Sequence, residues 1–511
     1  MKICIVELDA RQYTMTSHLL MPKMGPLEVG TYLARHGHDV TVHVECMNDF
    51  PEAEMDRYDV VGFSVGVGNA NRVYETAERL RRTTRARLVA GGPHATVLPD
   101  EPLDHGFDYV VRGEGEETAR ELMATLEAGG DVAAVRGLSW RGNDGNVHNP
   151  ARPFMAEFDT IPDYSLLKGF RRKSLFEQVR MGKIYENFVQ TTRGCPFPCE
   201  FCYENKIGGT GYRRRSIAAV VEDIRYKIDW LKCPVFYITD ANFGLDVKYT
   251  KQLLQAIIDA GIRARFTALV RIEIARDEEM LDLLRRAGFE MLCTGIESLD
   301  DETLTDVAKM QTFRQIEENI RKIRSFGLNV FGLFIGGFEN DTEAGIARIA
   351  DFALKNSMIG LNIMALGEYP GQSTVVPNHR YFNRNWDYFP GHYYTFFTPK
   401  IRPSRLQRAV SREMLRFYSR TNCARTLLRS GWNDFRLMFG GRYVYRHVWR
   451  AAQAYIPYLE EVERGHYDEH DRFLSDERLK AEYERSAPPP RQRVVSTVRG
   501  LGFDTPVSAF Q

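Results

Sequence analysis

The segment Thr191-Thr-Arg-Gly-Cys195-Pro-Phe-Pro-Cys199-Glu-Phe-Cys202-Tyr203 holds three of the chain's eight cysteines within eight residues. A structural zinc site closes a tetrahedron with four Cys or His ligands, and the nearest further candidates, His148 and Cys233, are distant in sequence. Iron–sulfur clusters are also usually held by four thiolates. Three thiolates on a four-iron cluster would leave one iron open, and an open position separates catalytic from structural metal sites. The segment therefore predicts a catalytic metal centre.

The composition is that of an ordinary globular protein. The 511 residues are 43% hydrophobic, with 68 basic and 68 acidic side chains, and the length suggests about two to four domains. No apolar run approaches the roughly 20 residues that span a bilayer, and the N-terminus MKICIVELDA lacks a secretory signal, so we expect a cytoplasmic protein. The zero net charge argues against nucleic-acid binding. The remaining cysteines are too sparse for a disulfide framework and are expected to be buried: Cys4, Cys46, Cys233, Cys293 and Cys423.

Six strand-like segments alternate with helical patterns from Phe188 onward. The expected strands are 188–192, 235–239, 265–270, 291–296, 330–335 and 361–365. Six such units at spacings of roughly 25 to 45 residues predict a partial (β/α)6 barrel of the TIM type, which we place over residues 185–372. In such barrels the chemistry lies at the carboxyl ends of the strands, and the three cysteines directly follow the first strand.

Residues 1–130 predict a doubly wound, Rossmann-like domain. Five near-continuous apolar strands, expected at 3–6, 40–44, 60–65, 88–90 and 109–111, alternate with helical patterns, as in a parallel sheet covered on both faces. Glycine-rich loops follow the last three, where such domains bind ligands. A nicotinamide site is disfavoured, because Asn71 stands where the third glycine of that motif belongs. Taken alone, each loop is equally well explained as a tight turn.

The rest of the chain comprises a linker over 131–184, with one hairpin near 138–145, and a mainly helical region over 373–511. Between Ile401 and Arg450 there are 12 Arg, no Lys and two acidic residues. Arginines recur every three or four positions from Arg402 to Arg420, which places them on one helix face. We favour a solvated face, with contact to an anionic membrane surface or an acidic substrate as the alternative. The tail after Ala487 is expected to be poorly ordered.

The spacing Cys-x3-Cys-x2-Cys followed by the aromatic Tyr203 resembles the signature of the radical S-adenosylmethionine (SAM) superfamily. This resemblance implies that Cys195, Cys199 and Cys202 hold a [4Fe–4S] cluster whose open iron chelates SAM. Reductive cleavage of SAM would then give a 5′-deoxyadenosyl radical that takes a hydrogen atom from an unactivated carbon. Other segments are similar to SAM-binding motifs of the superfamily, and they imply further cofactor-binding residues: Asp240, Asn242, Arg271, Glu297 and Gly336.

The first domain resembles the cobalamin-binding domain of B12-dependent radical SAM enzymes, a class that includes C-methylases and the anaerobic cyclase of chlorophyll biosynthesis. The resemblance implies cobalamin contacts from Ser64, Gly91, Gly92, Gly113 and Glu114. Many cobalamin domains carry an Asp-x-His-x-x-Gly motif whose His ligates cobalt, but here Asp9 precedes Ala10 and Arg11, and His18 lacks that context. Two options stay open: cobalamin bound without a His ligand, which we favour, or a domain that no longer holds cobalamin.

The resemblance implies C-methylation, in which methylcobalamin supplies the methyl group and the SAM-derived radical activates the substrate carbon. The alternative is a radical SAM oxidoreductase, cyclase or rearranging enzyme that uses cobalamin differently or not at all. A methylthio transferase would need three cysteines in the N-terminal domain, which has only Cys4 and Cys46, and a non-catalytic electron carrier or regulator leaves the SAM-like motifs unexplained. The expected partners are an electron donor such as flavodoxin or ferredoxin and a small-molecule substrate, either lipid-like, polycyclic or another natural-product intermediate.

Overall fold

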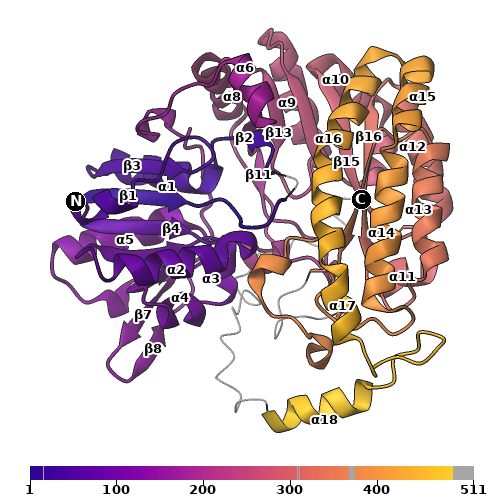
Figure 1. The fold of residues 1–511 in the computed structure, drawn as a ribbon. Helices are drawn as coiled ribbons and strands as arrows, with labels where there is room; N and C mark the ends of the chain where they lie inside the picture. Colours follow the sequence, from indigo (N-terminus) through magenta and orange to yellow (C-terminus); the bar gives the residue numbers. More distant parts are fainter. Residues whose placement is uncertain (15, 308, 310, 368–374, 487–511) are drawn as a thin grey trace.

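The computed structural model describes residues 1–14, 16–307, 309, 311–367 and 375–486. Two sheets flanked by helices are followed by a helical C-terminal region (Figure 1). This confirms the predicted α/β class, with a doubly wound first domain, a partial barrel and a mainly helical C-terminus. The expected boundary at residues 372 and 373 and the tail after Ala487 lie outside the described residues.

Five parallel strands form the main part of the first sheet, in the order β3-β1-β4-β5-β6. They contain the five predicted apolar segments: β1 (Lys2–Glu7), β3 (Asp39–Val44), β4 (Val60–Ser64), β5 (Arg87–Gly91) and β6 (Tyr109–Val111). The principal helices are α1 (Met24–Arg35), α2 (Ala70–Leu80) and α5 (Gly115–Glu127), with short helices α3 (Pro93–Val97) and α4 (Asp100–Asp104). Helix α2 packs on one face of the sheet, and α1 and α5 pack on the other. Because both faces are covered, the strands are apolar on both sides.

The first sheet continues beyond the domain boundary predicted at residue 130. Strand β7 (Leu138–Gly142) pairs antiparallel with β6, and β8 (Gly145–His148) pairs with β7. The hairpin expected within the linker therefore belongs to a seven-stranded sheet, and the prediction of a linker from residue 131 is wrong for this part. A polar hairpin has the same sequence pattern whether or not it joins the edge of a sheet. Further along lie α6 (Leu175–Met181) and β9 (Ile184–Tyr185), which pairs with β2 (Leu19–Leu20).

All six strands expected in the barrel form one parallel sheet. Their order and bounds are β10 (Asn187–Val189), β13 (Val235–Ile238), β14 (Arg265–Val270), β15 (Phe289–Glu297), β16 (Asn329–Gly336) and β17 (Gly360–Ala365). The connecting helices are α8 (Ile217–Leu231), α9 (Val247–Asp259), α10 (Glu278–Ala287), α11 (Asp301–Asp306), α12 (Phe313–Ser325) and α13 (Glu343–Lys355). Between sheet and helices, the rings of Phe236, Phe266 and Phe289 pack in succession. Within the described residues β10 and β17 each pair on one side only, so the barrel is open.

The C-terminal region is helical, and its helices are α14 (Pro403–Phe417), α15 (Arg420–Ser430), α16 (Trp432–Ala454), α17 (Ile456–Val462) and α18 (Asp476–Ser486). Helices α14 and α16 contact β17, the last strand of the open barrel. The Tyr418 hydroxyl accepts from the Leu361 N–H and donates to the Leu361 carbonyl, both at 2.9 Å, and its ring stacks on Tyr445 of α16. None of the described helices is both long and apolar enough to cross a membrane.

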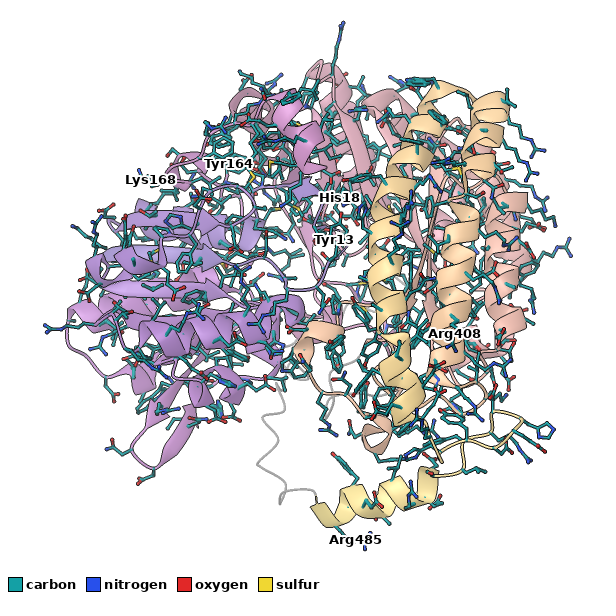
Figure 2. The ribbon with its side chains drawn as sticks, viewed as in Figure 1. Tyr13, His18, Tyr164, Lys168, Arg408 and Arg485 are labelled. Carbon is teal, nitrogen blue, oxygen red and sulfur yellow. The ribbon has the colours of Figure 1, made fainter. Side chains whose placement is uncertain are left out.

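The arginines of α14 form ion pairs with neighbouring segments. Arg408 (labelled in Figure 2) pairs with Glu460, and Arg405 pairs with Glu343 at 2.6 Å. Arg402, Arg412 and Arg416 likewise each have a carboxylate partner. From Arg402 to Arg416 this row is therefore the solvated face that we favoured, and these charges are already neutralised by the chain itself.

Candidate active site

The three cysteines lie on the loop between β11 (Thr192–Arg193) and α7 (Glu204–Ile207). Gly194 opens the loop with a φ of +83°, and a Cβ at this position would overlap the carbonyl oxygen of Gly211. The Cys195 N–H donates to the Gly209 carbonyl at 3.1 Å, and the Cys202 N–H donates to the Cys199 carbonyl at 3.0 Å. The backbone therefore holds the loop in one conformation beside the carboxyl end of β10.

The chemistry of the three thiols fits an iron–sulfur cluster. All three are free and partly exposed. Burial raises the pKa of Cys202 to about 11 and also raises that of Cys195, and the neighbouring Cys199 raises both further. Within the described chain, no group of three His, Cys, Asp or Glu side chains converges closely enough for one metal ion. Three neighbouring thiols on one loop suit a [4Fe–4S] cluster, whose iron would hold them as thiolates.

Asp240 holds the residues that lead into the cysteine loop. Its buried carboxylate accepts from the backbone N–H groups of Thr191 and Thr192, at 2.6 and 3.1 Å, and from both hydroxyls. These bonds fix the two residues that lead into the cysteine loop. The structure thus gives Asp240 a positioning role, and its predicted contact with SAM stays a prediction.

Arg271 lies against the cysteine loop. Its guanidinium stands 4.0 Å from the centre of the Phe197 ring, and its charge lowers the pKa of Cys195, although burial is the larger effect and raises it. The backbone N–H of Arg271 donates to the Asn242 side chain at 3.1 Å, and its guanidinium pairs with Glu273 at 2.8 Å. Two predicted SAM-binding residues are therefore in direct contact, and one of them places a cation where a carboxylate ligand would be attracted.

The remaining predicted SAM residues lie at or just after strand ends. Glu297 ends β15 with a φ of +66°, a strained backbone for a residue other than glycine, and its carboxylate accepts from Lys309 at 2.8 Å. Gly336 ends β16, where a Cβ would overlap the Tyr394 hydroxyl. Tyr203 immediately precedes α7 and packs against the core of the first domain. Backbone strain is common at functional sites, which supports the choice of Glu297.

One cavity of about 830 Å³ is shared by the two domains. All five residues predicted to contact cobalamin line it: Ser64, Gly91, Gly92, Gly113 and Glu114. Residues of the barrel line it as well: Phe188, Gln190, Thr239 and Met364. Gly92 has a φ of +95°, and a Cβ there would lie 3.0 Å from the Val65 carbonyl oxygen, so the close approach of these loops requires glycine. The predicted cobalamin loops and the barrel therefore face the same space.

A buried group of ion pairs joins the cysteine loop to the first domain. Arg193 lies two residues before Cys195, and its guanidinium is 3.0 Å from Glu28, 3.1 Å from Glu114 and 2.9 Å from Glu116. Burial raises the pKa of Glu28, while Arg193 opposes the shift. The sequence predicted only Glu114 of this group, because the partners are 77 or more residues from Arg193 and no local pattern links them.

His392 is a cavity residue that the sequence did not indicate. It is buried, its ring packs edge-on against Trp449 at 5.7 Å, and in the described chain neither ring nitrogen has a hydrogen-bond partner. Burial lowers its pKa to about 4, so at pH 7 the neutral ring offers one donor and one acceptor. In the sequence, His392 lies among aromatic residues that are expected to pack the domain, so nothing marked it as a residue of the site.

Comparison with known proteins supports both halves of this site. Residues 189–353 match the family model of the radical SAM superfamily, and residues 11–123 match that of the B12 binding domain. An uncharacterized methyltransferase of Pyrococcus horikoshii is 27% identical over 69% of this chain and 78% of its own length. The hopanoid C-3 methylase of Methylococcus capsulatus is 30% identical over 65% of this chain and 64% of its own length. The anaerobic magnesium-protoporphyrin IX monomethyl ester cyclase of Rubrivivax gelatinosus is 27% identical over 61% of this chain and 58% of its own length.

A solved structure shares the fold along most of the chain. The radical SAM methyltransferase TsrM of Kitasatospora setae, solved with cobalamin and a [4Fe–4S] cluster, aligns over 90% of this chain and 99% of its own. The TM-score is 0.62 at 19% sequence identity. The likeness therefore shows a common fold that includes the C-terminal region, where neither family model matches.

The conformation of Gly194 gives a test of the loop. Gly194→Ala should reduce iron bound after anaerobic reconstitution at least about fivefold, because a strained backbone costs about 1–3 kcal/mol and the Cβ overlaps a carbonyl. Gly211→Ala is the matched control, since a Cβ there has no heavy atom within 4 Å. Iron and sulfide analysis of both variants measures the effect. Equal iron content in the two would contradict the assigned loop geometry.

The site contains three free cysteines on a fixed loop, a cation beside them, and a cavity that the loop-bearing barrel shares with the first domain. The two family models cover these two parts of the chain separately. Their order along the chain and the shared fold with TsrM agree with this arrangement. The chain is therefore a radical SAM enzyme with an N-terminal B12-binding domain.

Proposed function

We propose that this enzyme methylates an unactivated carbon of a small, largely apolar substrate. The observation that carries the proposal is the shared cavity, which is lined by the glycine loops of the B12-binding domain and by the inner side of the barrel. Two cofactors that act on one carbon must meet it in a single enclosed space. Methyltransferases among the relatives support the same reaction.

The chain's own residues would position the reactants. When bound, the cluster with SAM would supply a radical that takes a hydrogen atom from carbon, and cobalamin would supply the methyl group. Cys195, Cys199 and Cys202 would hold the cluster and leave one iron to SAM, whose carboxylate Arg271 would attract. Arg193 fixes the loop against the first domain through its three carboxylate partners. The mainly apolar lining keeps water from the reacting carbon.

Reduction of the cluster needs a one-electron donor, for which we propose a cytoplasmic flavodoxin or ferredoxin. The three cysteines are only partly buried, so a cluster on this loop would lie near the surface. Short separation from the surface is what electron transfer from a docked protein requires.

His392 is proposed to recognise a polar group of the substrate. His392 lines the cavity, and its two buried ring nitrogens have no partner in the described chain; a buried polar group without a partner costs about 1–3 kcal/mol. A neutral donor and acceptor suit a hydroxyl or carbonyl group on an otherwise apolar molecule. Because burial lowers its pKa to about 4, the ring stays neutral from about pH 6 to 8, and recognition is independent of pH in that range.

A cyclase or oxidoreductase is the second candidate, because a cyclase is among the relatives. Anaerobic turnover of an extract from the native host with methyl-labelled SAM separates the two. We expect label in an extractable product together with 5′-deoxyadenosine. A product that forms with 5′-deoxyadenosine but carries no label would exclude methyl transfer and leave the second candidate.

The role of His392 is tested with the same labelled product. His392→Ala should lower the rate at limiting substrate about threefold to tenfold, the usual effect of one hydrogen bond, while His392→Gln, which keeps a donor and an acceptor, should restore much of it. His466→Ala, on a histidine that does not line the cavity, is the control. If His392→Ala instead loses cobalamin, the ring contacts the cofactor and the substrate assignment is wrong.

A further inference from the structure

Helix α6 exposes nearly all of its large apolar side chains. Leu175, Phe176 and Val179 are 75%, 76% and 72% exposed, and Met181 and Ile184 are 42% and 56% exposed. No residue of α6 is buried. Helices of globular proteins turn their apolar side inward, so α6 presents an apolar face that the described chain leaves uncovered.

A second exposed apolar face lies on α16. Trp432, Phe439 and Tyr443 are 65%, 53% and 47% exposed and are spaced by seven and four residues. Arg446 and Arg450 continue the series at intervals of three and four. These intervals place all five side chains on one face of the helix, with aromatic rings in its first half and arginines in its second.

The two faces adjoin. Gly182 directly follows α6, and a Cβ built on it would lie 2.8 Å from Cζ of Tyr443. We name the combined area the α6–α16 surface, which consists of Leu175, Phe176, Val179, Ile184, Trp432, Phe439 and Tyr443. Monomeric proteins rarely expose so many large apolar side chains together unless the patch binds something.

Cations without carboxylate partners border this surface. Among the described residues, no carboxylate forms an ion pair with Arg180 at the end of α6, with Arg429 of α15, or with Arg446 and Arg450. Arg450 is close enough to lower the pKa of Arg446, with burial and then Arg442 adding to the effect. The arginines of α14, in contrast, each have an acidic neighbour. Exposed apolar side chains beside unneutralised arginines are typical of proteins that lie on anionic bilayers.

The charges argue against a second copy of the chain as the occupant. A twofold dimer joins the same patch of both subunits, so it would bring two sets of unpaired arginines to one interface without supplying carboxylates to pair with them. Anionic lipid headgroups would instead supply the missing negative charges, and the acyl region would cover the apolar side chains.

The cavity extends to residues beside the α6–α16 surface. Lys183, which lies between Gly182 and Ile184, lines the cavity, as do Thr14 and Ser17. Tyr13, in the same segment, has its ring 5.8 Å from His447 of α16, and Figure 2 shows Tyr13 and His18 between the two halves of the molecule. We propose that the α6–α16 surface docks on an anionic bilayer and that the substrate is a membrane-soluble molecule that enters the cavity from it. The second part rests on the proposed function, whereas the docking does not.

Vesicle flotation tests the docking without any substrate. The reconstituted enzyme should float with vesicles of phosphatidylcholine containing about 30% phosphatidylglycerol, bind weakly to pure phosphatidylcholine, and bind less at about 0.5 M NaCl. Phe176→Asp should lower the partition coefficient about tenfold or more, since burial of such a side chain contributes about 1.5–3 kcal/mol. Arg446→Glu should lower it several-fold, at about 1 kcal/mol per charge.

Matched controls are available elsewhere on the chain. Leu474→Asp changes an apolar side chain that is 63% exposed, and Arg408→Glu reverses an arginine that is ion-paired. Both should bind like the wild type. Absence of flotation in the wild type, or equal loss in the controls, would overturn the proposal. If the wild type is a dimer and Phe176→Asp dissociates it, the proposal is also overturned and the surface is assigned to a second copy. If vesicle binding fails but a detergent-solubilised substrate still gives labelled product, the docking proposal is wrong and the proposed methylation stands.

Discussion

The cysteine loop is held from both domains, and the rest of the site depends on this. Asp240 accepts hydrogen bonds from Thr191 and Thr192 on the barrel side, and Arg193 lies among three carboxylates of the first domain. Three thiols satisfy only part of a cluster's coordination. A cluster on this fixed loop would therefore keep one position for a further ligand.

The two sheets have the same arrangement of strands and loops. In each, parallel strands end in loops at the carboxyl edge, and these two edges meet at the same cavity. Residues such as Pro390 and His392, from the C-terminal region, complete its lining. The predicted cofactor-binding residues therefore come from the two parts of the chain with family matches, whereas the cavity lining comes in part from a region without one. This division agrees with relatives that keep the architecture and carry different substrates in their names.

Much of the fold followed from local patterns. The apolar strands of both sheets and the cysteine spacing are local features, and each appears in the structure where it was expected. The edge pairing of β7 with β6 was missed because nothing in a hairpin specifies its outer neighbour. The partners of Arg193, the position of His392 and the exposed face of α6 also depend on contacts between distant segments. Such contacts leave no periodic signal in a single sequence.

The most direct test of the account is the coordination of the cluster. Mössbauer or electron–nuclear double resonance spectra of the anaerobically reconstituted enzyme, recorded with and without SAM, report on the individual iron sites. We predict a [4Fe–4S] cluster in which SAM changes the signal of one iron only. Zinc at Cys195, Cys199 and Cys202, or a cluster whose spectrum SAM leaves unchanged, would contradict the account.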